Sequence, residues 1–128
     1  MVVKVLRTKH ASHPWHLQRF FAEARISLAL DHPNVVKVMG FGHSEEGYFY
    51  LAMERLDGHE LTDEIRSAGA LPPWRACDII VALLAGLEAA NAQGLVHRDI
   101  KPSNVLISRR AEGGRRVTLI DFGIATTL

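Results

Sequence analysis

The side chains best suited to chemistry are concentrated in two short segments near the C-terminal end of the sequence. Residues 97–104 read His-Arg-Asp-Ile-Lys-Pro-Ser-Asn, and residues 121–123 read Asp-Phe-Gly. Together they supply carboxylate and amide oxygens, the hard groups that Mg²⁺ prefers, and nearby cationic side chains. A carboxylate can also accept a proton from a hydroxyl group. This set suits a reaction in which a negatively charged group is positioned and its charge is neutralised.

Residues 97–104 resemble the catalytic loop of protein kinases, and a lysine two positions after the aspartate is typical of the serine/threonine class. The six fixed residue types are expected by chance in a chain of this length roughly two times in a million. Residues 121–123 resemble the kinase metal-binding loop; chance alone would place them in roughly one or two such chains in a hundred. Because they follow a predicted strand in the family's order, the two motifs support each other.

The resemblance implies transfer of the γ-phosphoryl group of ATP, with Mg²⁺, to serine or threonine hydroxyls of a protein substrate. The transition state is loose and anionic, so the protein must position it and neutralise its charge. By resemblance, Asn104 and Asp121 hold Mg²⁺, and Asp99 accepts the hydroxyl proton. Lys101 is expected beside the transferred phosphate.

Two positions near the N-terminus also match the kinase pattern. Lys4 resembles the strand lysine that contacts the α- and β-phosphates, and Glu23 resembles the helix glutamate that pairs with this lysine. Either residue alone would usually be a solvated charge, but their spacing matches the family. Val2 departs from the pattern, which usually has alanine two positions before the lysine. The larger side chain would either crowd the adenine or repack.

Residues 53–58 resemble the hinge between kinase lobes. Backbone groups of Glu54 and Leu56 are expected to hydrogen-bond adenine, and Met53 is expected to close the back of the pocket. Glu60 is expected near the ribose, although a carboxylate at the start of a helix explains it equally well. Leu106 completes the expected nucleotide-binding set. A stack of side chains linking the lobes is expected to contain Ser27, Val38, His97 and Phe122.

Hydrophobic periodicity predicts the elements that hold these residues. Helices are expected at 15–30, 61–68 and 72–93, the last opened by two prolines and stopped by Gly94. Strands are expected at 2–6, 35–41, 48–53, 105–108 and 117–120, with turns at 42–47 and at Gly113-Gly114. The predicted fold class is therefore α+β, with the two-lobed architecture of a protein kinase in incomplete form. Residues 1–53 are predicted to belong to the N-lobe, 54–60 to the hinge and 61–128 to the C-lobe.

Composition narrows the function classes. The 128 residues are 48% hydrophobic and 23% charged with a net charge of +1, which is ordinary for a globular domain. This balance favours neither a nucleic-acid partner nor an anionic membrane. The single cysteine, Cys77, excludes an internal disulfide and fits a reducing, cytoplasmic setting. The longest apolar run, 79–87, is too short to span a bilayer, so no membrane segment is expected in this chain.

Three functional hypotheses follow. The first is a serine/threonine kinase domain seen in part, because nothing resembling a glycine-rich loop or an Ala-Pro-Glu segment is present. Such a fragment is expected to have little activity by itself. The second is a non-catalytic remnant that binds nucleotide or protein. The third is a small-molecule phosphotransferase of related fold, against which Arg98 and Lys101 both argue.

Overall fold

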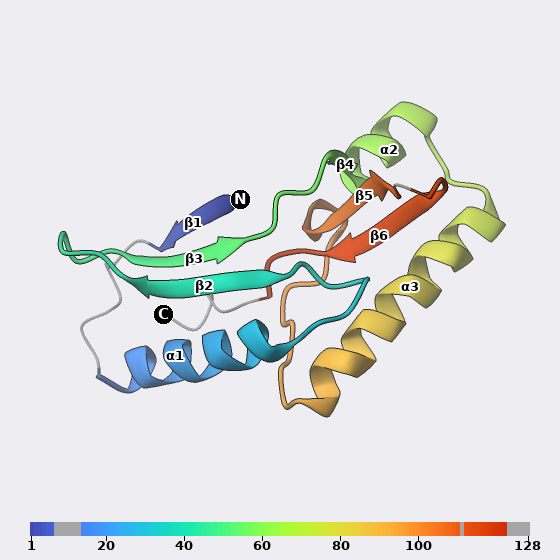
Figure 1. Ribbon diagram of the computed structural model, residues 1–128. Helices are drawn as coiled ribbons and strands as arrows, with labels where there is room; N and C mark the ends of the chain where they lie inside the picture. Colours follow the sequence, from blue (N-terminus) through green and yellow to red (C-terminus); the bar gives the residue numbers. More distant parts are fainter. Residues whose placement is uncertain (7–13, 111, 123–128) are drawn as a thin grey trace.

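The computed structural model describes residues 1–6, 14–110 and 112–122 (Figure 1). Within them, two three-stranded antiparallel sheets are accompanied by three α-helices and one short 3₁₀ helix. In chain order the elements are β1 (Val2–Leu6), α1 (Pro14–Ala29), β2 (Val38–His43), β3 (Phe49–Met53), β4 (Gly58–Glu60), α2 (Leu61–Ala68), α3 (Pro73–Ala92), η2 (Pro102–Asn104), β5 (Val105–Arg109) and β6 (Arg115–Leu119). Among the described residues, no helix has both the length and the apolar character needed to cross a bilayer.

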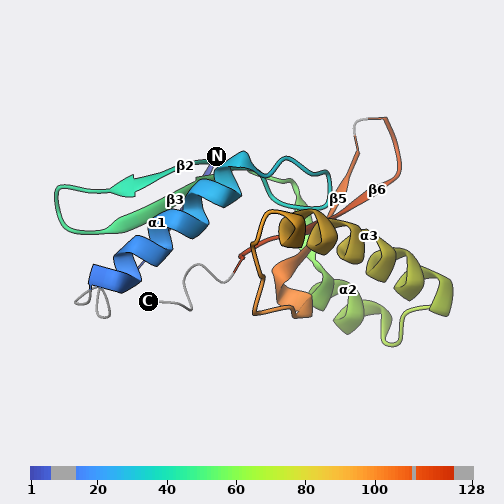
Figure 2. The ribbon, with the colours of Figure 1, turned by 90° about the horizontal axis from the view of Figure 1, so that it is seen from below.

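The first sheet has the strand order β1-β3-β2, and α1 packs against it (Figures 1 and 2). Burial alternates along β3, where Phe49, Leu51 and Met53 point into the core, because successive strand residues face opposite sides. From α1, Phe20 and Ala24 are fully buried, and the Phe20 ring lies 5.6 Å from that of Phe49. The helix therefore covers the apolar face of this sheet.

The second sheet has the order β4-β5-β6 and lies with α2 and α3 at the other end of the molecule (Figures 1 and 2). Its core consists of buried apolar side chains from α3 and the strands, including Ile79, Leu83, Ile107, Val117 and Leu119. A continuous chain segment, residues 54–57, joins β3 to β4 and is called the connecting segment below.

A second link between the two sheets is the loop between α1 and β2. The Val36 N–H donates to the Leu119 carbonyl (2.9 Å), and the Leu119 N–H donates to the Asn34 carbonyl (2.8 Å). The Asn34 side-chain amide also donates to the Val117 carbonyl (2.7 Å). Residues 34–36 therefore form a short parallel bridge with the end of β6, which fixes the first sheet to the second.

Most predicted elements are confirmed, with three corrections. The strand expected at 35–41 begins only at Val38. Val35 and Val36 belong to the bridge with β6 and not to the first sheet. Strand β4 was not expected. Its first residue is Gly58, where a Cβ atom would stand 2.3 Å from the Ile107 carbonyl oxygen. The last strand runs from Arg115 to Leu119, earlier than the expected 117–120.

Gly86 lets α3 approach the bridging loop closely. A Cβ atom at this position would lie 2.9 Å from the Asn34 carbonyl oxygen and 3.2 Å from a methyl group of Val35. The nearest atom belongs to the backbone that makes the bridge, so it cannot rotate away. The fold therefore requires glycine here for space and not for a left-handed conformation.

We predict that Gly86→Ala destabilises the protein, although alanine is normally better than glycine in a helix by roughly 1 kcal/mol. Overpacking typically costs about 1–3 kcal/mol, so the free energy of unfolding should fall by up to about 2 kcal/mol. Urea denaturation measures the change. Ala85→Gly, one residue away, provides the size of the helix-propensity effect alone. A stabilising Gly86→Ala would show that α3 and the loop can separate without cost.

Candidate active site

His97 organises the loop 97–104 from within the core. His97 is 2% exposed. Its Nε2 lies 3.1 Å from the Ile120 carbonyl oxygen, and its Nδ1 accepts a hydrogen bond from the Asp99 N–H at 3.3 Å. Burial lowers the pKa of His97, which favours the neutral ring. A neutral ring that accepts at Nδ1 must carry its proton on Nε2, where it donates to Ile120. One side chain thus fixes the start of the loop to the chain leaving β6.

Asp99, Lys101 and Asn104 form a compact polar cluster. The Lys101 Nζ lies 2.7 Å from the Asp99 Oδ2, and the Asn104 side-chain amide donates to the Asp99 carboxylate (3.0 Å) and carbonyl (2.8 Å). The hydrogen bond from Lys101, with a smaller one from Asn104, holds the pKa of Asp99 below its usual value. Asp99 is therefore ionised at neutral pH and can accept a proton. Because the Asn104 nitrogen is directed at Asp99, its side-chain oxygen points away from that carboxylate.

Asp121 lies two residues after the end of β6 and meets the first sheet. The Lys4 Nζ lies 2.5 Å from the Asp121 Oδ1, although 117 residues separate them in sequence. Asp121 has a backbone φ of 64°, and Arg98 one of 63°. Non-glycine residues rarely adopt this left-handed conformation, and those that do are concentrated at functional sites.

The expected ion pair between Lys4 and Glu23 is absent, which corrects the sequence-based expectation. The Lys4 ammonium pairs with Asp121, and the Glu23 carboxylate accepts a hydrogen bond from Arg98 at 2.9 Å. The physical reason is the placement of α1, which brings the buried Glu23 to the loop 97–104 and not to β1. Both ion pairs therefore cross between the first sheet with its helix and the loops of the second part.

A cavity of about 440 Å³ lies between β1, the connecting segment and β5. Six residues of the expected site line it: Lys4, Met53, Glu54, Leu56, Leu106 and Asp121. Val2 also lines it, opposite Met53 in the strand register. Three further lining residues, Val3, Val36 and Ile120, were missed. Ile120 could have been identified from its position directly before Asp121. No sequence signal identified Val36, which lines the cavity because the loop between α1 and β2 places it there.

Two residues of the expected nucleotide-binding set do not line this cavity. Glu60 is exposed at the end of β4. It is paired in register with Leu106, which lines the cavity, but Glu60 itself does not line it. Glu23 lies with Arg98 as described above. The structure therefore brings together the adenine-facing part of the expected set but leaves Glu60 as an exposed carboxylate at the start of α2.

The expected stack of side chains between the two parts is formed. The rings of His97 and Phe122 are 4.7 Å apart. Ser27, Val38 and Phe122 together line a small cavity of about 10 Å³, close to the volume of one water-sized probe. The Ser27 hydroxyl donates to the Glu23 carbonyl (2.9 Å), so its polar atom is satisfied within α1. Gly123, the last residue of the second motif, lies outside the described residues.

The oxygen atoms of Asp121 and Asn104 suit Mg²⁺, which needs few protein ligands, better than a metal ion whose ligands all come from protein side chains. In the described part of the chain no three His, Cys, Asp or Glu side chains are clustered as a metal site. Mg²⁺ usually takes one or two carboxylates and completes its shell with phosphate and water oxygens. One carboxylate from Asp121 and the amide oxygen of Asn104 match this pattern.

Comparison with known proteins defines the class. The protein kinase domain model matches residues 1–128. The chain is 39% identical over 125 residues to serine/threonine-protein kinase pkn2 of Myxococcus xanthus, and 38% identical over 128 residues to serine/threonine-protein kinase PrkC of Bacillus subtilis. The kinase domain of Mycobacterium tuberculosis PknI superposes with a TM-score of 0.84 at 31% identity. The chain belongs to the protein kinase family.

The match is nearly complete for this chain and partial for its relatives. It covers 98% of the chain but 15% of pkn2, and 100% of the chain but 19% of PrkC. Against the PknI kinase domain it covers 96% of this chain and 49% of that one. The structure is therefore a partial kinase fold, containing the first sheet, the connecting segment and the loops of the site.

We predict that Lys101→Met raises the pKa of Asp99 toward the ordinary aspartate value of about 3.9, because the principal hydrogen bond to the carboxylate is lost. Carbon-detected NMR titration of the Asp99 carboxyl group measures this shift without any activity assay. Lys37→Met removes a lysine that pairs with Asp31 in another loop and should leave the titration unchanged. An unaltered Asp99 titration in Lys101→Met would contradict the assigned interaction.

Proposed function

We propose that this chain is the nucleotide-binding and catalytic part of a serine/threonine protein kinase, which transfers the γ-phosphoryl group of ATP to hydroxyls of a protein substrate. Residues 1–53 then belong to the N-lobe, 54–60 to the hinge and 61–128 to the C-lobe. The observation that carries the proposal is the pairing of Lys4 with Asp121 at an apolar-walled cavity. The use of ATP places the proposed reaction in the cytoplasm.

The cavity suits adenine in size and chemistry. About 440 Å³ lies within the usual range of roughly 300–1,000 Å³ for small-molecule sites. Val36, Leu106 and Ile120 offer apolar walls, and Met53 closes one end. We assign the hydrogen bonds to adenine to the backbone groups of Glu54 and Leu56, which both line the cavity. Lys4 and Asp121 then lie where the phosphates and their metal ion must be held.

Within this proposal, the residues divide the work by charge. Asn104 and Asp121 hold Mg²⁺, which neutralises negative charge on the phosphates when it is bound. Asp99 accepts the proton of the substrate hydroxyl, a role that its ionised carboxylate and its position in the loop support. Lys101, 2.7 Å from Asp99, adds a positive charge beside the transferred group.

A second candidate function is nucleotide or protein binding without catalysis. One observation favours it: Glu23 is paired with Arg98 and Lys4 with Asp121, so the lysine–glutamate pair of an active kinase is not formed. The retention of Asp99, Asn104 and Asp121 favours catalysis instead. The two candidates differ in whether phosphoryl transfer depends on Asp99.

We predict that, in a protein that carries this chain within a complete kinase domain, Asp121→Asn and Asp99→Asn separate binding from chemistry. Asp121→Asn should weaken Mg²⁺-dependent ATP binding and turnover together, because a charged metal ligand is lost. Asp99→Asn should leave ATP affinity nearly unchanged and lower kcat by about 10²–10⁴-fold, the usual contribution of a general base. Calorimetry with Mg²⁺ and ATP measures the affinity, and radiolabelled phosphate transfer to a general protein acceptor measures kcat.

Asp63→Asn is the matched control, since Asp63 is an exposed carboxylate on α2 outside the site. Equal loss of ATP affinity in both site variants would contradict the division of roles. Nucleotide binding without any Asp99-dependent turnover would instead support the binding module. An unaltered chain that binds no nucleotide would contradict the kinase proposal and would leave only protein binding from the second candidate.

A further inference from the structure

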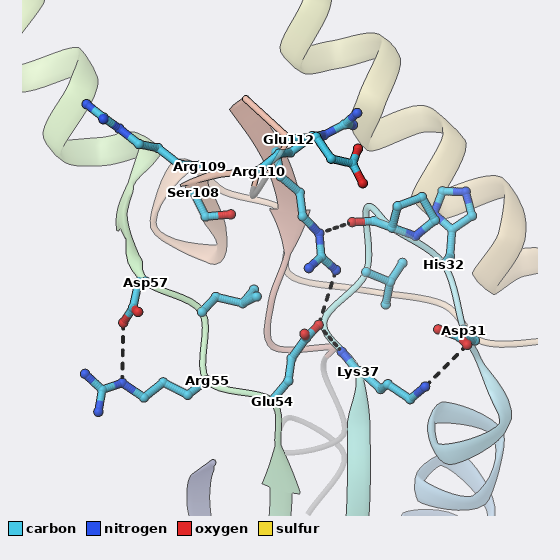
Figure 3. Close-up of a pocket in the computed structure, with 14 residues that line it drawn as sticks. Asp31, His32, Lys37, Glu54, Arg55, Asp57, Ser108, Arg109, Arg110 and Glu112 are labelled. Atoms are coloured by element: carbon cyan, nitrogen blue, oxygen red, sulfur yellow. Dashed lines mark hydrogen bonds and ion pairs between the residues drawn. The ribbon is translucent and has the colours of Figure 1, made fainter. Parts of the chain in front are cut away.

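A cavity of about 720 Å³ lies behind the connecting segment (Figure 3). It is lined by the loop between α1 and β2, by the connecting segment and by the β5–β6 hairpin. Glu54 and Leu56 line this cavity and also the proposed nucleotide cavity. The connecting segment is therefore a wall shared by the two cavities.

Four of the charged side chains in this rear cavity form two ion pairs that are exposed to solvent. Lys37 lies 3.3 Å from Asp31, and Arg55 lies 3.6 Å from Asp57; all four side chains are more than half exposed. Exposed ion pairs of this kind contribute little to structure. Arg109 extends away from Glu54 (Figure 3), and the described residues provide no ion pair for it. These groups do not converge on a common point, so the cavity is not an evident anion site.

One ion pair in the cavity is different because it is partly buried. The Arg116 Nη2 lies 3.2 Å from the Glu54 Oε1, with the two side chains 24% and 26% exposed. The Arg116 Nε also donates to the Pro33 carbonyl at 2.6 Å. A single guanidinium on β6 therefore holds both the connecting segment and the α1–β2 loop. Its planar fork of donors allows two acceptors to be held in fixed directions.

Glu54 is fixed by the loop as well as by Arg116. Its Oε1 accepts the Lys37 N–H (2.9 Å), and its own N–H donates to the Lys37 carbonyl (2.9 Å). Backbone and side chain of the same residue are thus both held from the rear cavity (Figure 3). A residue held in this way loses little freedom when its remaining backbone groups bind a ligand.

We propose that Arg116 is a positioning residue for adenine recognition. It acts through Glu54, whose backbone it orients from behind, and it does not touch the nucleotide. The inference rests on the proposed nucleotide site and extends it to a side chain outside the nucleotide cavity. Nucleotide affinity is therefore set partly from the rear cavity, through the shared wall.

The test compares adenosine with Mg²⁺–tripolyphosphate as probes on the 128-residue chain, using calorimetry. Arg116→Gln should raise the Kd for adenosine roughly 5- to 20-fold, in the lower part of the usual range for coupling between sites. Its Kd for tripolyphosphate should not change, because that probe contacts the Lys4 and Asp121 end of the cavity. Arg116→Lys should be intermediate, because an ammonium keeps the charge but cannot hold Pro33 and Glu54 in one plane.

Arg109→Gln is the matched control, which removes an arginine from the same cavity without a contact to Glu54 and should change neither Kd. Equal weakening of both probes by Arg116→Gln would mean a merely structural role and would overturn the inference. Unchanged adenosine affinity in Arg116→Gln would also overturn it, while leaving the proposed function intact.

Amide hydrogen exchange separates the inference from the proposed function. In the chain without ligand, the Glu54 N–H should exchange faster in Arg116→Gln than in Arg109→Gln, because Arg116 supports its hydrogen bond to Lys37. Equal exchange of the Glu54 N–H in the two variants would overturn the positioning role of Arg116 even if both variants still bind adenosine. If the unaltered chain binds no adenosine, the proposed nucleotide site fails, and with it the role of Arg116 in adenine recognition.

Discussion

The short bridge between residues 34–36 and the end of β6 is the constraint on which the arrangement of the site depends. Its backbone hydrogen bonds join Val36 and Asn34 to Leu119, two residues before Asp121. The next residue, Ile120, donates its N–H to the Asn104 carbonyl and accepts from His97. The bridge therefore sets the position of the first sheet relative to the loop 97–104 through bonds that no side-chain substitution removes. Gly86 protects this arrangement by keeping α3 close to the same loop.

Two ion pairs of the site cross between the two parts. Lys4 on β1 reaches Asp121 after β6, and Glu23 on α1 reaches Arg98 in the loop 97–104. A Lys4–Glu23 pair would keep both charges within the first part and would release Asp121 and Arg98. Lys4 and Asp121 are each about one-third exposed, so their ion pair is partly screened by solvent and is worth little.

The bounds of individual elements could be predicted from the sequence, but contacts between residues far apart in the chain could not. Helix α2 and strand β1 have the expected bounds, because hydrophobic periodicity and proline or glycine signals act over a few residues. Six of the residues that line the cavity beside β1 were expected from the kinase motifs and hinge pattern, and their role in nucleotide binding stays a prediction. The bridge at Val35 and Val36 was misread as a strand, since a run of apolar residues does not say which partner buries it. The partner of Glu23 depends on the placement of a whole helix, which no local pattern encodes.

Ser27 shows how the position of α1 is maintained without a large apolar residue in the stack. Its hydroxyl donates to the Glu23 carbonyl, so a buried polar group is satisfied and carries no desolvation penalty. The cost is a gap of about 10 Å³ beside Phe122, where a longer side chain would have made dispersion contacts. The helix is held by Phe20 against Phe49 and, about one turn further along, by the Glu23–Arg98 ion pair. The hydrophobic contact fixes α1 on its own sheet, and the ion pair joins the same helix to the loop 97–104.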